Sequence, residues 1–319
     1  MKIRRWNPLD WFLGDWIRSI PAGRRLRFAR RLGVVKWTVI AAMACLVAWQ
    51  EFGDRAASSS VPPRMEMTVA EASQASALAA SIKRTWDIEV RYQGDTSTFY
   101  LPLPHIPDAW KLEPVAAPDI VPGLKAISTA LSAYPQSYVK AASSQVGIIY
   151  LCRKISINGL EFGGMFSAGA IYVPAIDMDD AYEVTFAQDT VHHEFALTGL
   201  YGGQSPQDAW RAVNPPGFAY RGDNDKSIVD TAEHRADAND ATDDVHEAGF
   251  IFEYAKASLV EDWQTYAEQA FGHPEGLIGL VKRFPRVKAK AKIFVDHYEM
   301  LDPAFGAYFE RTGLKDASR

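Results

Sequence analysis

The sequence predicts an α+β fold behind an N-terminal membrane segment. An uncharged apolar run lies near the start of the chain, short runs rich in β-branched residues fill its middle, and helical patterns dominate its last third. About 48% of the 319 residues are hydrophobic, so the chain is able to form a large core. Strands followed by helices favour a small mixed sheet with a mostly helical C-terminal half.

Charge is distributed unevenly along the chain. Residues 1–36 contain ten Lys and Arg against two Asp, a net charge of +8, which leaves −13 on the remainder of a chain whose total is −5. Nucleic-acid binding needs Lys and Arg on the binding face. The acidic body therefore argues against a nucleic-acid partner.

Residues 1–36 form a basic segment with apolar residues at helical spacing. The stripe consists of Leu9, Phe12, Leu13, Trp16, Ile17 and Ile20. Such a helix is expected to lie on an anionic membrane surface, and a loosely ordered tail is the alternative.

Residues 37–50 are predicted to be a transmembrane signal anchor. Trp37 and Trp49 flank the uncharged run, where interfacial tryptophans are common. The positive charge before it predicts a cytoplasmic N-terminus and a main domain translocated to the periplasm or the cell exterior. A cleaved signal peptide is the main alternative.

Residues 51–67 are predicted to be a linker, and residues 68–319 the globular domain. The expected helices cover residues 69–86, 123–134, 186–200, 258–271 and 276–301, the last interrupted by Pro285. The expected strands cover residues 88–92, 146–152, 155–161 and 170–174. Residues 101–122, with six prolines, and residues 202–249 are expected to be irregular. Cys45 and Cys152 are not expected to form a disulfide.

The predicted helix at 186–200 contains His192-His193-Glu194. In the zinc-peptidase motif H-E-x-x-H, two histidines four residues apart bind zinc from one helical face and the Glu is the general base. His193 and Glu194 match the first half of this motif, whereas Leu197 stands at the second histidine. Ordinary structural helix histidines are the alternative interpretation.

A second segment contains Tyr254 and, seven residues later, Glu261 at the start of a predicted helix. A glutamate from a later helix is the third ligand of His₂Glu zinc sites. Alternatively, Glu261 closes a capping box with Ser258, and Tyr254 belongs to the core.

Together these segments resemble lethal-factor-like zincin peptidases and bacterial zinc-binding metallopeptidases. The order Tyr134-Pro135, buried strand, Gly163-Gly164, edge strand, His-His-Glu helix is similar to theirs, over roughly residues 120–310. The resemblance implies a zincin-like fold, with zinc bound by His193 and Glu261. It also implies that Glu194 activates the attacking water and that Tyr254 stabilises the oxyanion.

Leu197 is the departure from this family pattern. His234, His246 or an Asp of the acidic stretch between residues 223 and 247 are candidate replacement ligands, whereas His192 points about 100° away from His193. With zinc, the chain is expected to be a membrane-anchored peptidase. Without it, the expectation is an inactive pseudopeptidase that binds a peptide or protein partner. A domain of another kind remains the third hypothesis, and no phosphate-binding loop or G-x-S-x-G motif is present.

Overall fold

The computed structural model describes residues 64–92, 110–157, 160–167, 169–222 and 241–319. The chain divides into two units, Met1–Pro62 and Pro63–Arg319, with the boundary inside the predicted linker. The expected basic helix at 1–36 and the anchor at 37–50 lie outside the described residues. Among the residues described, no helix is both long and apolar enough to cross a bilayer.

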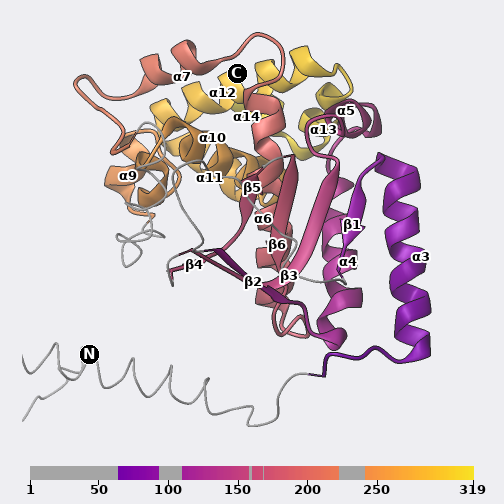
Figure 1. Cartoon of the computed structure of the whole chain (residues 1–319). Helices are drawn as coiled ribbons and strands as arrows, with labels where there is room; N and C mark the ends of the chain where they lie inside the picture. Colours follow the sequence, from indigo (N-terminus) through magenta and orange to yellow (C-terminus); the bar gives the residue numbers. More distant parts are fainter. Residues whose placement is uncertain (1–63, 93–109, 158–159, 168, 223–240) are drawn as a thin grey trace, which may run out of the picture. The chain divides into compact units, whose positions relative to one another are not determined.

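A six-stranded mixed sheet forms the first half of the described unit (Figure 1). Its strands are β1 (Glu89–Arg91), β2 (Trp110–Pro114), β3 (Ile148–Ile157), β4 (Leu160–Phe162), β5 (Met165–Ser167) and β6 (Ala170–Pro174). The order is β1-β3-β6-β5, with β3 parallel to both β1 and β6. Strands β2 and β4 pair antiparallel with the far end of β3, and β5 pairs antiparallel with β6 at the edge of the sheet.

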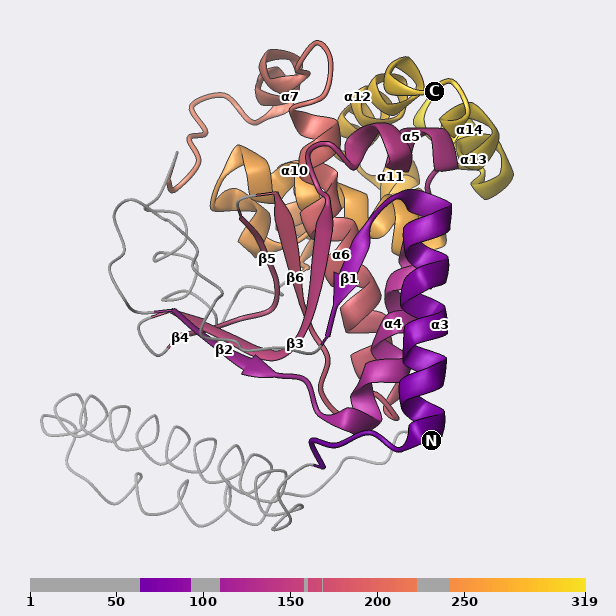
Figure 2. The same ribbon diagram turned by 45° about the vertical axis from the view of Figure 1, so that its right-hand side comes forward.

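Three long helices belong to the first half of the unit. They are α3 (Val69–Trp86), α4 (Ala117–Leu131) and α6 (Ala181–Leu200). They pack against one another, α3 on α4 and α4 on α6. Helix α3 runs alongside α4, as Figure 2 shows. It begins at a capping box in which the Thr68 side chain and the Glu71 carboxylate each satisfy the other residue's backbone amide. This arrangement confirms the α+β class predicted from the sequence.

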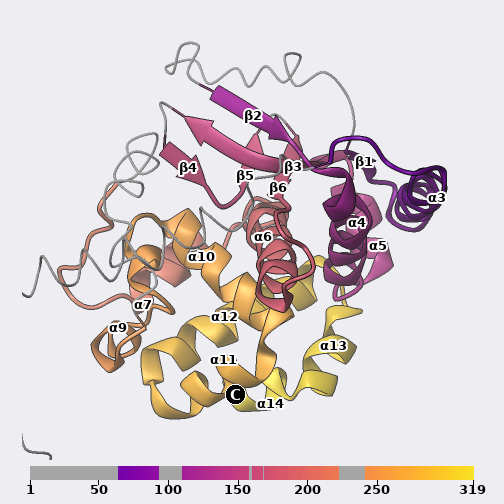
Figure 3. The ribbon, with the colours of Figure 1, turned by 90° about the horizontal axis from the view of Figure 1, so that it is seen from below.

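The C-terminal half is helical and packs on α6 (Figure 3). It contains α10 (Leu259–Ala267), a π-helical turn η4 (Glu268–Gly272), α11 (Pro274–Arg283), α12 (Pro285–Leu301), α13 (Phe305–Thr312) and α14 (Leu314–Ser318). Aromatic side chains fill the space between these helices and α6. Phe195 of α6, Phe271, Tyr298 and Phe305 are all buried there.

The structure differs from the sequence predictions in several places, and it adds an edge strand, β5, and a short helix, α5 (Gln136–Ala142), that were not predicted. The stretch 101–122 is not irregular throughout, because β2 and the start of α4 lie within it, with a proline in the first helical turn, where its missing N–H is tolerated. One long strand, β3, replaces most of the two strands expected at 146–152 and 155–161. The stretch 202–249, expected to be irregular, contains two short helices, α7 (Gln207–Val213) and α9 (Asp243–Glu247).

Candidate functional site

Helix α6 lies against the turn between β4 and β5. Its first turn is capped by Asp180, whose Oδ1 accepts the Tyr182 amide at 2.8 Å. Near its middle, Thr190 Oγ1 donates to the Gly163 carbonyl at 3.1 Å. A Cβ on Gly164 would overlap the Thr190 methyl group and lie 3.1 Å from Glu194 Oε1. Only glycine therefore lets this turn approach α6 so closely.

The α10 helix brings Glu261 to His193. Ser258 Oγ accepts the Glu261 amide at 3.1 Å and so starts the helix. The Glu261 carboxylate is directed elsewhere: its Oε2 lies 3.1 Å from His193 Nε2, and it also hydrogen bonds to Tyr254. The Ser258 cap and a role for Glu261 in the site are thus compatible with each other.

A second carboxylate, which the sequence analysis did not single out, occupies the other side of the imidazole. Glu268 Oε1 contacts His193 Nδ1. Glu268 follows Glu261 by seven residues, or about two helical turns, and so lies near the same face of the helical stretch. That spacing is the signal that the sequence offered, but it is common on any helix.

His193 is held as a cation by this geometry. Each ring nitrogen faces a carboxylate oxygen, and a carboxylate only accepts hydrogen bonds, so both nitrogens must carry a proton. Burial alone would lower the pKa of His193. The carboxylates of Glu268 and Glu261 outweigh burial and hold that pKa well above its ordinary value.

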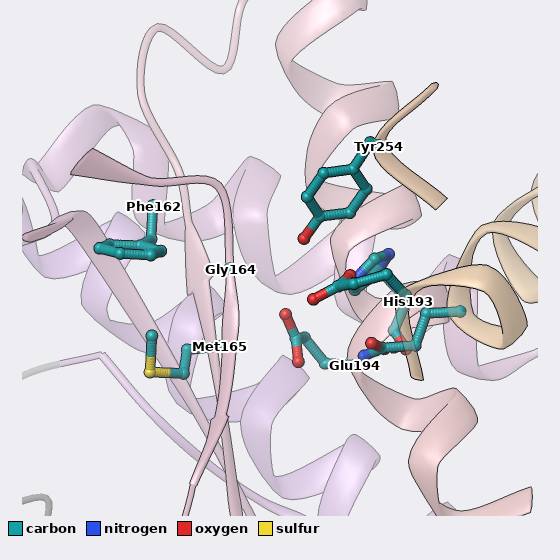
Figure 4. A pocket seen from close by; sticks show the side chains of 8 residues that line it. Phe162, Gly164, Met165, His193, Glu194 and Tyr254 are labelled. Carbon is teal, nitrogen blue, oxygen red and sulfur yellow. Dashed lines mark hydrogen bonds and ion pairs between the residues drawn. The ribbon is translucent and has the colours of Figure 1, made fainter. Parts of the chain in front are cut away.

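The side chains of His193, Glu194, Tyr254 and Glu261 line one pocket of about 90 Å³. Gln264 completes this polar side, and its Nε2 donates to the His193 carbonyl at 3.1 Å. The rest of the lining comes from Phe162, Gly164 and Met165. Figure 4 shows Phe162 and Met165 across the pocket from Tyr254, His193 and Glu194.

Burial changes the acidity of two further groups in the pocket. It raises the pKa of Glu194 to about 7, against the opposing effect of His193. The Phe166 amide of β5 donates to this carboxylate. Burial and the charge of Glu261 raise the pKa of Tyr254 well above its ordinary value, so its hydroxyl stays protonated.

The other described histidines lie outside this pocket. His192 Nδ1 is 3.1 Å from the Tyr134 hydroxyl, and burial lowers the pKa of His192 to about 3. His246 Nε2 is 3.1 Å from the Ile251 carbonyl, so the structure does not bring this candidate ligand to His193. His273 pairs with Asp189 at 2.9 Å. His234 lies outside the described residues.

The donor set does not fit the zinc site that the family resemblance implies. Leu197 packs against the hydrophobic core and does not line the pocket. Within the described ranges, no group of three or more His, Cys, Asp or Glu side chains is placed to hold a metal ion. A catalytic zinc site needs three protein ligands. Only His193 and Glu261 occupy the ligand positions expected from the sequence.

A buried ion pair supports α10 next to the pocket. Lys290 Nζ of α12 lies 2.6 Å from Asp262 Oδ2, and both side chains are 0% exposed. The same carboxylate oxygen accepts hydrogen bonds from Trp210 Nε1 at 2.8 Å and from the Tyr220 hydroxyl at 2.7 Å. These bonds join α12 and the segment around α7 to the residue that follows Glu261. They therefore fix the start of α10, where the Glu261 carboxylate is aimed.

The four site residues expected from the sequence lie together in the structure. His193, Glu194, Tyr254 and Glu261 were singled out from two segments about sixty residues apart in the sequence, and they share one pocket. Comparisons with family models, with curated proteins and with solved structures give no match for this chain.

Proposed function

We propose that this chain is a zincin-like pseudopeptidase whose pocket binds an extended polypeptide and leaves its peptide bonds intact. The observation that supports this proposal best is the state of His193. Its two nitrogens are bonded to Glu261 and Glu268, and no second histidine stands one turn along the helix, where Leu197 packs into the core.

Metal binding at His193 competes with a tightly held proton. A histidine ligand must be neutral, so a metal has to displace the Nε2 proton that Glu261 accepts. That displacement also removes the hydrogen bond between the two side chains. With two protein ligands in place of three, the gain from coordination is also smaller. Both effects favour the metal-free form.

The sheet edge next to the pocket favours a polypeptide ligand. Strand β5 ends the strand order β1-β3-β6-β5, and its first residue, Met165, lines the pocket together with the preceding Gly164. Extended peptides commonly add to exposed sheet edges through main-chain hydrogen bonds. A chain lying along β5 would come within reach of Glu194, which already accepts the Phe166 amide. Because the sequence predicts translocation, we propose a periplasmic or extracellular ligand.

A zinc peptidase is the second candidate function, and one observation favours it. Metal-bound histidines commonly donate their other ring N–H to a carboxylate, as His193 does to Glu268. A pKa of about 7 also suits Glu194 for general base catalysis, with Tyr254 as donor to an oxyanion. This function requires a further ligand from residues 223–240, for which His234 and the Asp residues of that stretch are the candidates.

Incubation with peptides distinguishes the two functions. The full chain, purified in detergent and supplied with zinc, is mixed with a diverse pool of unstructured peptides. We expect mass spectrometry to find a retained subset of peptides, all at full length. Cleavage products that appear with the native chain and disappear in Glu194→Ala would overturn the pseudopeptidase proposal in favour of the peptidase.

A further inference from the structure

The pocket contains more acidic groups than basic ones. Glu194 and Glu261 line it, Glu268 adjoins it through His193, and His193 is the single cationic side chain in this described cluster. The His193, Glu261 and Glu268 side chains are 13%, 17% and 20% exposed, so the charged end of the pocket is open to solvent. One imidazolium cannot neutralise both Glu261 and Glu268, and above about pH 7 Glu194 adds a third negative charge.

Glu194 is the most deeply buried of these carboxylates. It is only 7% exposed, and the Phe166 amide donates a hydrogen bond to it. A carboxylate has about four acceptor positions. Because Glu194 also lines the pocket, a ligand in the pocket can donate hydrogen bonds to its remaining acceptor positions.

The opposite wall of the pocket is apolar. Phe162 and Met165 are partly buried and lie across from Glu194 (Figure 4). An aromatic ring and a thioether suit a methylene chain, and the ring also attracts a cation. The volume of about 90 Å³ is well below the ~300–1,000 Å³ of sites for drug-sized ligands. It matches a single side chain better than a whole metabolite.

We propose that the pocket binds the Lys or Arg side chain of an extended polypeptide. The methylene stem packs on Phe162 and Met165, and the cationic head donates hydrogen bonds to Glu194 and Glu261. This inference rests on the proposed peptide-binding function and adds the identity of the bound side chain. Long cationic side chains combine an apolar stem with a charged head, which is the combination that this pocket complements.

Binding of a matched peptide series tests the inference. The probes are fluorescein-labelled peptides of seven residues, alanine except at the centre, which is Lys, Arg, citrulline, norleucine or Glu. Binding to the full chain in detergent is followed by fluorescence anisotropy. We expect the Lys and Arg peptides to bind at least tenfold more tightly than the citrulline and norleucine peptides, and the Glu peptide most weakly. We expect Glu194→Gln to remove most of this preference, and Glu310→Gln, on the exposed surface, to leave it unchanged.

The outcomes separate this inference from the function on which it rests. Equal binding of the neutral and cationic peptides would overturn the cation preference and leave peptide binding intact. Failure of every peptide to bind would overturn both. Cleavage of the Lys or Arg peptide alone would support the charge preference and overturn the non-cleaving function. Because the series is measured on the native chain, the result does not depend on the stability of any variant.

Discussion

Replacing Leu197 with histidine should create the zinc site that the native chain lacks. Position 197 lies one helical turn after His193, and residues four apart on a helix have Cβ atoms about 5–6 Å apart. Glu261 is already 3.1 Å from His193 Nε2. Leu197→His therefore adds the third protein ligand to a pair that is in place.

The size of the effect follows from two opposing changes. Leu197 is partly buried, and a fully buried Leu side chain stabilises a fold by about 1.5–3 kcal/mol, so its loss should destabilise the metal-free variant by about 1 kcal/mol. Zinc at a hundredfold excess over its Kd stabilises a folded protein by about 2.7 kcal/mol. For a unit of this size, that gain raises Tm by roughly 5–10 °C.

Differential scanning fluorimetry with and without zinc measures this gain. The native chain should show little zinc-dependent shift, and Leu197→His should show the full shift. Tyr182→His is the matched control, because it adds an exposed histidine to the same helix far from the predicted site. A Leu197→His variant that folds but gains no more from zinc than this control would refute the assignment of position 197 as the missing ligand.

Three further predictions concern the turn beside the pocket, a buried histidine and the buried ion pair. Gly164→Ala should displace the turn that packs on α6, lower stability by about 1–3 kcal/mol and weaken peptide binding. As a control, Gly279→Ala lies in a helix with open space around it and should raise stability by about 1 kcal/mol. Thermal denaturation measures the two stabilities, and fluorescence anisotropy measures peptide binding. His192, with a pKa lowered by burial to about 3, is neutral when folded and protonates on unfolding, so its own contribution to stability should fall by about 1.4 kcal/mol per pH unit as the pH drops below about 6.5. Urea titrations should therefore find that lowering the pH costs the native chain more stability than it costs His192→Gln. Lys290→Met should lower the free energy of unfolding by about 3–5 kcal/mol, because the Asp262 carboxylate stays buried without its partner. Urea unfolding should show that the double variant with Asp262→Leu recovers much of that loss. Full stability in the single variant would contradict the importance of the pair.

Local patterns predicted much of the fold. Helix α3 begins and ends at the predicted residues. The features that define it, such as the N-terminal capping box, involve residues that are close together in the sequence. Strand β3 was underestimated because Arg153 and Lys154 interrupt its apolar run. These two residues are half-buried and lie near the part of β3 that pairs with β2 and β4. A search for continuous apolar runs does not detect such a segment as a strand.

The sequence predicted part of the site and missed its long-range partners. His193, Glu194, Tyr254 and Glu261 stood out because a motif fixes the chemistry expected at each spacing. Glu268 carries no such signal, and its contact with His193 joins residues 75 apart. The Lys290–Asp262 pair depends on how α12 packs against α10, which only the tertiary structure defines. The sequence shows Leu197 at the position of the second histidine ligand. Whether this substitution removes metal binding depends on whether another residue supplies the missing ligand.

Metal content tests the central claim most directly. The full chain is exposed to excess zinc, freed of unbound ions and measured by inductively coupled plasma mass spectrometry beside His193→Ala and Glu261→Ala. The pseudopeptidase proposal predicts far less than one zinc per chain and no difference among the three proteins. About one zinc per chain, lost in both variants, would contradict it and direct the search for the missing ligand to residues 223–240.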